Sequence, residues 1–156
     1  MNTGGTTAEV EVQYAVSREW LPGETEIRRW AQVALEQCHR AGGEMVVRLT
    51  DEAESARLNE QYRHKPGPTN VLSFPFEPPA GVPVDHLGDL VISVPVVERE
   101  AGEQGKPLEA HLAHMVVHGT LHLLGYDHLE EADAQEMERL EIAILGQLGY
   151  DDPYRL

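Results

Sequence analysis

The sequence has little of three features that mark common classes of protein. It has one cysteine, Cys38, so no disulfide bond can form within the chain, which fits a reducing cytosol. It has no apolar run near the ~18 residues that indicate a membrane span. Its opening stretch, MNTGGTTAEV, lacks the basic region and apolar segment of a secretory signal peptide, so we expect none. These absences argue against a disulfide-stabilised scaffold and against a membrane-spanning protein.

Basic residues are scarce as well. The chain has 12 Lys and Arg against 27 Asp and Glu, which gives a formal net charge of −15. This balance argues against an extended cationic surface for nucleic acid. The densest basic cluster consists of Arg57, Arg63 and Lys65. A polyanion would therefore have to bind at that cluster rather than across the whole surface.

The length of 156 residues suffices for one domain with a full hydrophobic core. Apolar residues alternate with polar ones in some segments and recur every three to four residues in others, which predicts strands and helices respectively. The predicted strands cover residues 9–16, 44–50, 71–76 and 90–94, and the predicted helices cover 24–41, 51–62, 95–105, 108–124 and a last segment through 148. We expect an α+β fold with a small mixed sheet of about four strands packed with about five helices. It forms a single domain over 9–156, preceded by a flexible N-terminal segment at 1–8.

Several residues have the chemistry of element boundaries. Gly42 and Gly43 are expected to end the first helix. Asp51 can cap the second helix, and Asp127 can cap the last one, because each has a glutamate three residues later. The stretch RHKPGPTN at 63–70 predicts a loop, since it holds two prolines and a glycine.

One stripe of the predicted 108–124 helix consists of histidines. Steps of three and four residues place them on one face of the helix; they are His111, His114, His118 and His122. The other faces are apolar, so the helix should be buried, and a buried polar group without a partner costs about 1–3 kcal/mol. The stripe is therefore either a set of core histidines bonded to backbone groups or part of a metal site. We expect His111 and His114 to have structural or ligand-orienting roles.

The segment HGTLHLLGYDH, which starts at His118, favours a metal site. His118 and His122 are four residues apart on a helix, so both rings can reach one ion. Gly125 ends the helix and lets the chain turn back, so His128 can supply the third protein ligand that zinc requires. Asp127 can orient one of these ligands. Imidazole suits several divalent metals, so the spacing indicates a metal site without naming the metal.

The same segment has the histidine and glycine positions of the long zinc-peptidase motif H-E-x-x-H-x-x-G-x-x-H. Gly119 stands where that motif has its glutamate, the general base that acts on bound water. Glycine has no side chain that can take a proton. The pattern therefore argues against a peptidase, unless a base such as Asp127 comes from elsewhere.

HGTLHLLGYDH resembles the signature of the YbeY family, which are bacterial metal-dependent endoribonucleases of ribosomal RNA maturation. Two further stretches are similar to that family: LNEQYRHKPGPTNVLSFPF at 58–76 and LGDLVISV at 87–94. The similar segments occupy much of 58–152, and the order of the predicted elements agrees with the family. Three separate motifs make the resemblance specific.

The resemblance implies one zinc ion held by His118, His122 and His128, and a catalytic role for Arg63. It implies single-stranded RNA as substrate, with roles in 3′-end maturation of 16S ribosomal RNA and in ribosome quality control. It also implies a cytoplasmic location and ribosomal partners, with no membrane and no DNA among the partners.

Elementary phosphate chemistry agrees with these roles. Zinc can activate water or stabilise the charge of the reacting phosphate, and a guanidinium such as that of Arg63 can bind the same phosphate through a planar fork of donors. Lys65 can hold a neighbouring phosphate. Asn70 and Ser73 can bind ligand, although capping a turn and filling a strand are alternative roles for them. His114 and Asp127 are candidates for orienting the metal ligands.

Two other functions remain open. The first is a zinc hydrolase of another substrate class, such as a peptidase, and the second is a non-catalytic ribosome-assembly factor with a structural zinc. Structural zinc usually has four protein ligands, whereas three histidines leave a fourth position open, as in catalytic sites. Because phosphate contacts normally dominate RNA affinity, the acidic charge leads us to hypothesise that a partner or the ribosome delivers the substrate.

Overall fold

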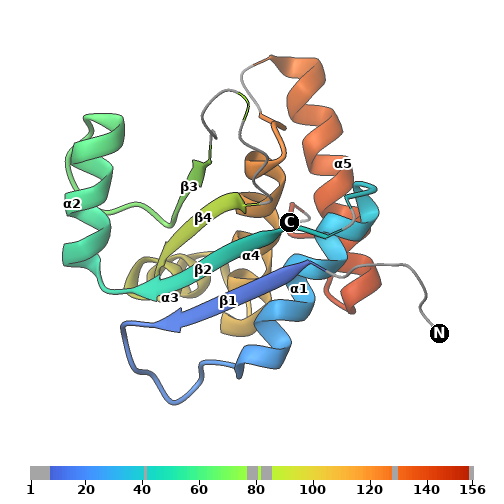
Figure 1. Ribbon diagram of the computed structural model, residues 1–156. Helices are drawn as coiled ribbons and strands as arrows, with labels where there is room; N and C mark the ends of the chain where they lie inside the picture. The colour runs from blue at the N-terminus through green and yellow to red at the C-terminus, as the bar shows by residue number, and fades with distance from the viewer. Residues whose placement is uncertain (1–7, 41, 77–80, 82–85, 128–129, 155–156) are drawn as a thin grey trace.

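The computed structural model describes residues 8–40, 42–76, 81, 86–127 and 130–154. Within these residues the chain forms one sheet of four strands and five helices (Figure 1). The strands are β1 (Glu9–Tyr14), β2 (Glu44–Thr50), β3 (Val71–Pro75) and β4 (His86–Ser93). The helices are α1 (Glu24–Gln37), α2 (Glu52–Arg63), α3 (Val94–Gln104), α4 (Leu108–Leu123) and α5 (Glu131–Leu148). The predicted α+β fold is confirmed.

The sheet is mixed and has the order β1-β2-β4-β3. β1 pairs with β2, and β2 with β4, in parallel, whereas β3 pairs with β4 in antiparallel orientation. Met45, Val47 and Leu49 alternate along β2 and are at most 1% exposed, as a strand with its apolar face on a core should be. β3 is an edge strand, and its last residue is Pro75, which fits the confinement of proline to sheet edges.

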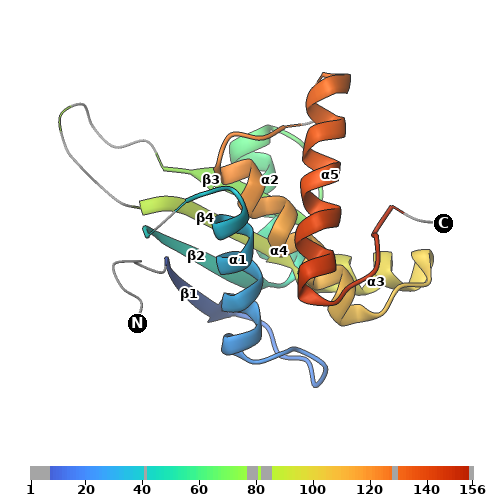
Figure 2. The same ribbon diagram turned by 90° about the vertical axis from the view of Figure 1, so that its right-hand side faces the viewer.

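Helices α1 and α4 cover one face of the sheet, and α5 packs outside them (Figure 2). α4 is buried around most of its circumference, and Leu112, Val116 and Leu121 are fully buried. Its sequence predicted this burial, because apolar residues occupy nearly every face. α4 also packs against β3. It therefore extends from the core to the edge of the sheet.

The end of α1 differs from its prediction. α1 stops at Gln37, before the two glycines that were expected to end it. His39 adopts a left-handed φ of 58°, and the backbone N–H of Arg40 donates to the carbonyl of Leu35 at 2.9 Å. This bonding closes the last turn in a Schellman motif, so the helix ends without a glycine at that position.

Aspartates were predicted to cap the starts of α2 and α5, and only the first of these predictions is confirmed. Asp51 caps α2 as expected, because its carboxylate accepts a 2.9 Å hydrogen bond from the backbone N–H of Glu54. The prediction that Asp127 caps the last helix was wrong. α5 starts at Glu131 with Glu130 in the N-cap position and no side-chain cap. Asp127 lies in the loop before α5 and lines the cleft described below.

Polar rather than apolar contacts attach α2 to its surroundings. Its buried residues are Ser55 and Asn59. The Ser55 hydroxyl donates to the carbonyl of Thr69 at 3.0 Å, and the Asn59 amide donates to the carbonyl of Gly67 at 2.9 Å. These bonds hold the loop after α2 against the helix. Arg63, which we expected to open that loop, is instead the last residue of α2.

We predicted a flexible N-terminal segment at residues 1–8, and of these only Ala8 lies in the described part of the chain. Residues 1–7 are not described, so their flexibility stays a prediction. Ala8, which we grouped with them, is 6% exposed, and its carbonyl accepts a 3.0 Å hydrogen bond from the amide of Gln32. None of the helices in the described ranges combines the length and the apolar character that crossing a membrane requires.

Candidate active site

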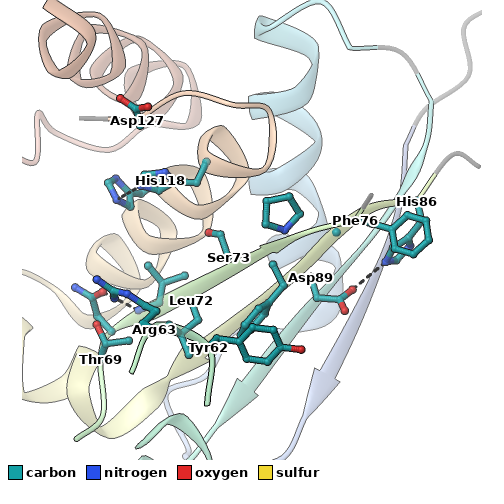
Figure 3. Close-up of a pocket in the computed structure, with 16 residues that line it drawn as sticks. Tyr62, Arg63, Thr69, Leu72, Ser73, Phe76, His86, Asp89, His118 and Asp127 are labelled. Carbon is teal, nitrogen blue, oxygen red and sulfur yellow. Dashed lines mark hydrogen bonds and ion pairs between the residues drawn. The ribbon is translucent and has the colours of Figure 1, made fainter. Parts of the chain in front are cut away.

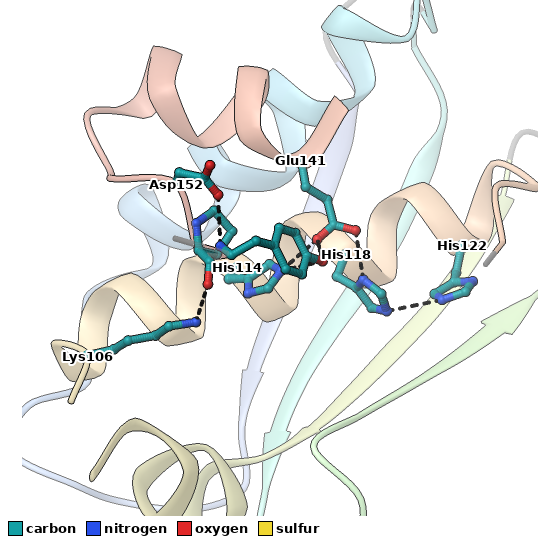
Figure 4. Close-up of polar contacts among 8 residues, drawn as sticks. Lys106, His114, His118, His122, Glu141 and Asp152 are labelled. Carbon is teal, nitrogen blue, oxygen red and sulfur yellow. Dashed lines mark hydrogen bonds and ion pairs between the residues drawn. The ribbon is translucent and has the colours of Figure 1, made fainter. Parts of the chain in front are cut away.

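The two histidines nearest the C-terminal end of α4 converge on one point. Nε2 of His118 and Nε2 of His122 lie 3.1 Å apart (Figure 4). Zinc binds imidazole nitrogen at about 2.0–2.1 Å, so two ligands of one tetrahedral ion lie roughly 3.3 Å apart. The two rings therefore fit a common ion. The described residues bring these two predicted ligands together, while His128, the third, lies outside the described residues.

A buried carboxylate stands behind this pair. Glu141 of α5 is 0% exposed, and its Oε2 accepts a 2.9 Å hydrogen bond from Nδ1 of His118. Its Oε1 accepts a 2.6 Å hydrogen bond from Nε2 of His114. Burial opposes ionisation of Glu141, but the hydrogen bonds from His114 and His118 outweigh it and lower its pKa to about 2.

An ionised Glu141 decides which nitrogen of His118 carries the proton. The carboxylate can only accept, so Nδ1 of His118 must donate, and the lone pair of Nε2 points toward His122. Ligating histidines commonly donate their second ring N–H to a carboxylate in this way. The geometry thus holds His118 in the tautomer that a metal requires.

Glu141, His114 and His118 also form a possible metal-binding group of their own. Each offers one ligand atom, and these atoms lie within 4.8 Å of one another. The contacts from Glu141 to the two rings, at 2.6 and 2.9 Å, are hydrogen-bond lengths, shorter than the roughly 3.3 Å between ligands of one tetrahedral ion. The geometry therefore favours a metal at His118 and His122, with Glu141 and His114 hydrogen-bonded behind it.

Tyr154 extends this polar network, and a second network lies further along α4. The hydroxyl of Tyr154 donates to Oε1 of Glu141 at 2.6 Å. Burial and this hydrogen bond to an ionised carboxylate raise the pKa of Tyr154, so it stays protonated and keeps donating. Along α4, Nε2 of His111 lies 2.9 Å from Glu100, which also accepts from the Asn70 amide at 3.2 Å. His111 and His114 were predicted to have structural or ligand-orienting roles. His111 faces the carboxylate of Glu100, and His114 faces that of Glu141.

A cleft of about 910 Å³ opens in front of the histidine pair (Figure 3). His118 and His122 line it together with four other predicted site residues, which are Arg63, Asn70, Ser73 and Asp127. Figure 3 shows His118 and Asp127 on the wall formed by α4 and the loop after it, and Arg63 on the opposite side. The cleft therefore joins the candidate metal pair to a guanidinium that comes from a different helix.

Three residues proposed for substrate binding differ in their placement. The Ser73 hydroxyl donates to the carbonyl of Gly119 at 3.2 Å, which ties β3 to α4. The carbonyl oxygen of the Asn70 side chain accepts from the backbone N–H of Val71 at 2.6 Å, so Asn70 braces the start of β3. Lys65 is exposed and does not line the cleft. Their roles toward substrate stay predictions.

Gly119 packs directly against the sheet. A Cβ added there would lie 2.8 Å from a methyl of Leu90 and 3.1 Å from a methyl of Val71. A side chain at the position that carries glutamate in zinc peptidases would therefore have to displace the methyl groups of Leu90 and Val71. This steric finding strengthens the argument against a peptidase that the sequence provided.

Glu141 and Tyr154 were not predicted as site residues. Glu141 lies on the buried stripe of α5 between Met137 and Ile144, four residues after one and three before the other. A carboxylate on an apolar stripe needs a buried partner, and this signal was present in the sequence. Tyr154 has no comparable signal, because it follows α5 in an irregular segment.

The sequence matches the family model described as Endoribonuclease YbeY over residues 14–149. A curated relative named Endoribonuclease YbeY, from Methylococcus capsulatus, is 64% identical over 135 residues, which cover 86% of this chain and 88% of the relative. Another relative with that name, from Nitrosococcus oceani, is 54% identical over 147 residues, which cover 93% of this chain and 95% of the relative.

A solved structure has the same architecture. The solution structure of a protein from Thermotoga maritima is similar with a TM-score of 0.58 and 23% sequence identity. The match covers 94% of this chain and 99% of that chain. At this level of identity the likeness bears on the fold alone, and it agrees with the α+β arrangement.

Proposed function

The chain belongs to the family of the endoribonuclease YbeY, and from that premise we propose that it is a zinc-dependent endoribonuclease of single-stranded RNA. We propose further that it acts in the cytoplasm, in 3′-end maturation of 16S ribosomal RNA and in ribosome quality control. The observation that carries the chemical part is the 3.1 Å separation of Nε2 of His118 and Nε2 of His122 at a cleft that Arg63 also lines.

The donor set fits zinc. His118 and His122 would hold the ion together with His128, and the hydrogen bond from Nδ1 of His118 to Glu141 presents Nε2 as the ligand atom. A bound zinc ion would act as a Lewis acid on a phosphate oxygen and would lower the pKa of water to about 7. Exposure of the pair to the cleft leaves a coordination position for substrate, which supports a catalytic metal over a structural one.

Arg63 supplies the second part of the site. It is exposed at the C-terminal end of α2 and lines the cleft at the same end as His118, on the facing wall. Its planar guanidinium can donate two hydrogen bonds to the non-bridging oxygens of a phosphate as negative charge builds on them. Asp127 lines the same cleft and is the candidate for taking a proton from the attacking group.

The acidic charge of the chain bears on how the substrate arrives. A net charge of −15 gives little long-range attraction for RNA. We therefore propose that the ribosome or a ribosomal protein brings the RNA to the cleft. Weak cleavage of free RNA together with efficient cleavage on ribosomal particles would support this delivery, whereas tight binding of free RNA at physiological salt would make it unnecessary.

The test compares cleavage of labelled single-stranded ribosomal RNA by the parent protein, His118→Ala and Arg63→Ala. Both variants should lose cleavage by about 10²- to 10³-fold or more, the range for removing one group that stabilises developing charge. Arg63→Ala should keep its metal, and His118→Ala should lose it. Arg29→Ala is the matched control, because Arg29 is exposed on α1 and does not line the cleft.

The outcomes separate the competing functions. Loss in both variants with metal retained in Arg63→Ala supports a single nuclease site. Cleavage at the parent rate by all variants would indicate a contaminating ribonuclease and would count against the proposal. Full support of ribosome assembly by Arg63→Ala would instead favour a binding factor with a structural metal.

A further inference from the structure

The end of the cleft away from the histidine pair is lined by aromatic rings. Tyr62, Phe74, Phe76 and His86 all line it. Among the described residues, the large hydrophobic side chains that are exposed are Tyr14, Tyr62, Phe76 and Tyr154. Tyr62 is 63% exposed and Phe76 is 42% exposed, so two of these four lie in one cleft. Exposed aromatic side chains gathered in a cleft indicate a ligand.

The rings are held in place by one another. Tyr62 and Phe74 meet edge to face with their centroids 4.3 Å apart. Phe76 and His86 meet edge to face at 5.4 Å. Phe74 and Phe76 are two residues apart along β3 and its continuation, so they project to the same side. The four rings come from α2, β3, the residue after β3 and β4, and they line the cleft as two edge-to-face pairs.

Charge divides the cleft into two ends. Arg63 lies at the end near His118, and Asp89 lies at the aromatic end, where its carboxylate is 3.0 Å from Nε2 of His86 (Figure 3). The Asp89 side chain is 48% exposed. A carboxylate repels a phosphate but accepts hydrogen bonds from the amino groups of nucleobases. The phosphate of a bound strand therefore belongs at the Arg63 end and a base at the aromatic end.

We infer that Tyr62, Phe74 and Phe76, with Asp89 at their side, form a subsite for one unpaired nucleobase next to the scissile phosphate. This inference rests on the proposed function, since it places a base beside the phosphate that Arg63 binds. A stacked base provides affinity that does not depend on positive charge, which this acidic chain lacks. A base inside a duplex cannot reach these rings, so the subsite also accounts for a preference for single strands.

The test uses a single-stranded RNA octamer with 2-aminopurine at one internal position, because the fluorescence of this base is quenched when it stacks on an aromatic ring. The parent protein should quench the probe and cleave it. Tyr62→Ala and Phe76→Ala should quench it less and raise KM by about 5- to 150-fold, the effect of losing one stacked base. The change should fall mainly on KM, because stacking binds ground state and transition state alike.

Two variants and one substrate are the controls. Tyr62→Phe keeps the ring and should behave as the parent, which separates stacking from the hydroxyl. Tyr14→Ala removes an aromatic side chain that is 40% exposed outside the cleft, and it should leave both readouts unchanged. An octamer with an abasic nucleotide at the probe position should bind the parent as weakly as the normal octamer binds Tyr62→Ala.

The possible results distinguish this inference from the function on which it rests. If the parent cleaves RNA and both alanine variants keep the parent KM and quenching, the base subsite is wrong and the nuclease proposal stands. If the parent neither binds nor cleaves the octamer and also fails to cleave RNA in ribosomal particles, both proposals are wrong. Equal losses in Tyr62→Phe and Tyr62→Ala would also overturn stacking as the source of affinity.

Discussion

Nδ1 of His118 lies 2.9 Å from Oε2 of Glu141, a residue 23 positions later in the chain. This hydrogen bond joins α4 to α5 directly behind the candidate metal pair. It also links the tautomer of His118, a half-buried candidate ligand, to a carboxylate that has no contact with solvent. Metal binding at the candidate pair would therefore depend on how α4 and α5 pack.

Replacing Glu141 by Gln should weaken zinc binding by about 10- to 100-fold, the usual effect of removing a partner that orients a ligating histidine. The amide keeps one acceptor oxygen for two imidazole donors, and it turns an N–H group toward one of them. Competition with a chromogenic chelator measures the affinity. Glu138→Gln is the matched control, because Glu138 is exposed on the same helix and should bind zinc as the parent does.

The metal could lie at His118 and His122, or at His114, His118 and Glu141. The two sites predict opposite results for His122→Ala. If the metal lies between His118 and His122, this variant should lose its zinc and the thermal stabilisation that zinc provides. That stabilisation is about 2.7 kcal/mol at a zinc concentration 100 times Kd. Metal content after gel filtration and melting curves with and without a chelator give the answer, with His111→Ala as a variant that keeps zinc. Stoichiometric zinc in His122→Ala would move the site to His114, His118 and Glu141.

Tyr154→Phe should lower the free energy of unfolding by about 1–3 kcal/mol, since it removes a donor from a buried ionised carboxylate. Urea denaturation at neutral pH measures the change. Tyr14→Phe should cost less, because the Tyr14 hydroxyl donates to the neutral carbonyl of Pro22 at the surface. Equal costs for the two variants would mean that Tyr154 does not support Glu141.

Gly119→Ala should lower the free energy of unfolding by about 1 kcal/mol, and by no more than about 2 kcal/mol. Alanine favours a helix over glycine by about 1 kcal/mol, but overpacking a core costs about 1–3 kcal/mol, and a Cβ here meets Leu90 and Val71 at 2.8 and 3.1 Å. Gly146→Ala in α5 is the control, and we expect it to raise the free energy of unfolding. Nothing lies within 4 Å of its Cβ, so this variant should gain stability. A stabilised Gly119→Ala would show that α4 can move off the sheet.

The fold could be predicted in most of its parts because its patterns are local. Alternation predicted β1, and apolar residues around most of the circumference predicted the burial of α4. The errors arose where backbone geometry overrode residue preference. His39 ended α1 in a left-handed conformation that glycine usually supplies, and Glu130 rather than Asp127 precedes α5. Neither choice is determined by the neighbouring residues alone.

The site could be predicted where its residues are close in sequence. His118 and His122 are one helical turn apart, so their spacing sufficed. Glu141 required knowledge of how α4 and α5 pack, although its place on an apolar stripe was a usable signal. Tyr62 and Phe76 could not be predicted as site residues from the sequence. They enter the cleft from two elements, and their exposure cannot be read from residue type.

The two sides of the cleft are attached to the molecule in different ways. His118 and His122 belong to α4, which the core surrounds, whereas Tyr62 and Arg63 end α2, whose buried residues are only polar. Helices with little buried apolar surface open locally at a lower free energy than core helices. Amide hydrogens of α2 should therefore exchange with solvent sooner than those of α4. The α2 side of the cleft, proposed to bind phosphate and base, should therefore open locally while the α4 side, proposed to hold the metal, keeps its structure.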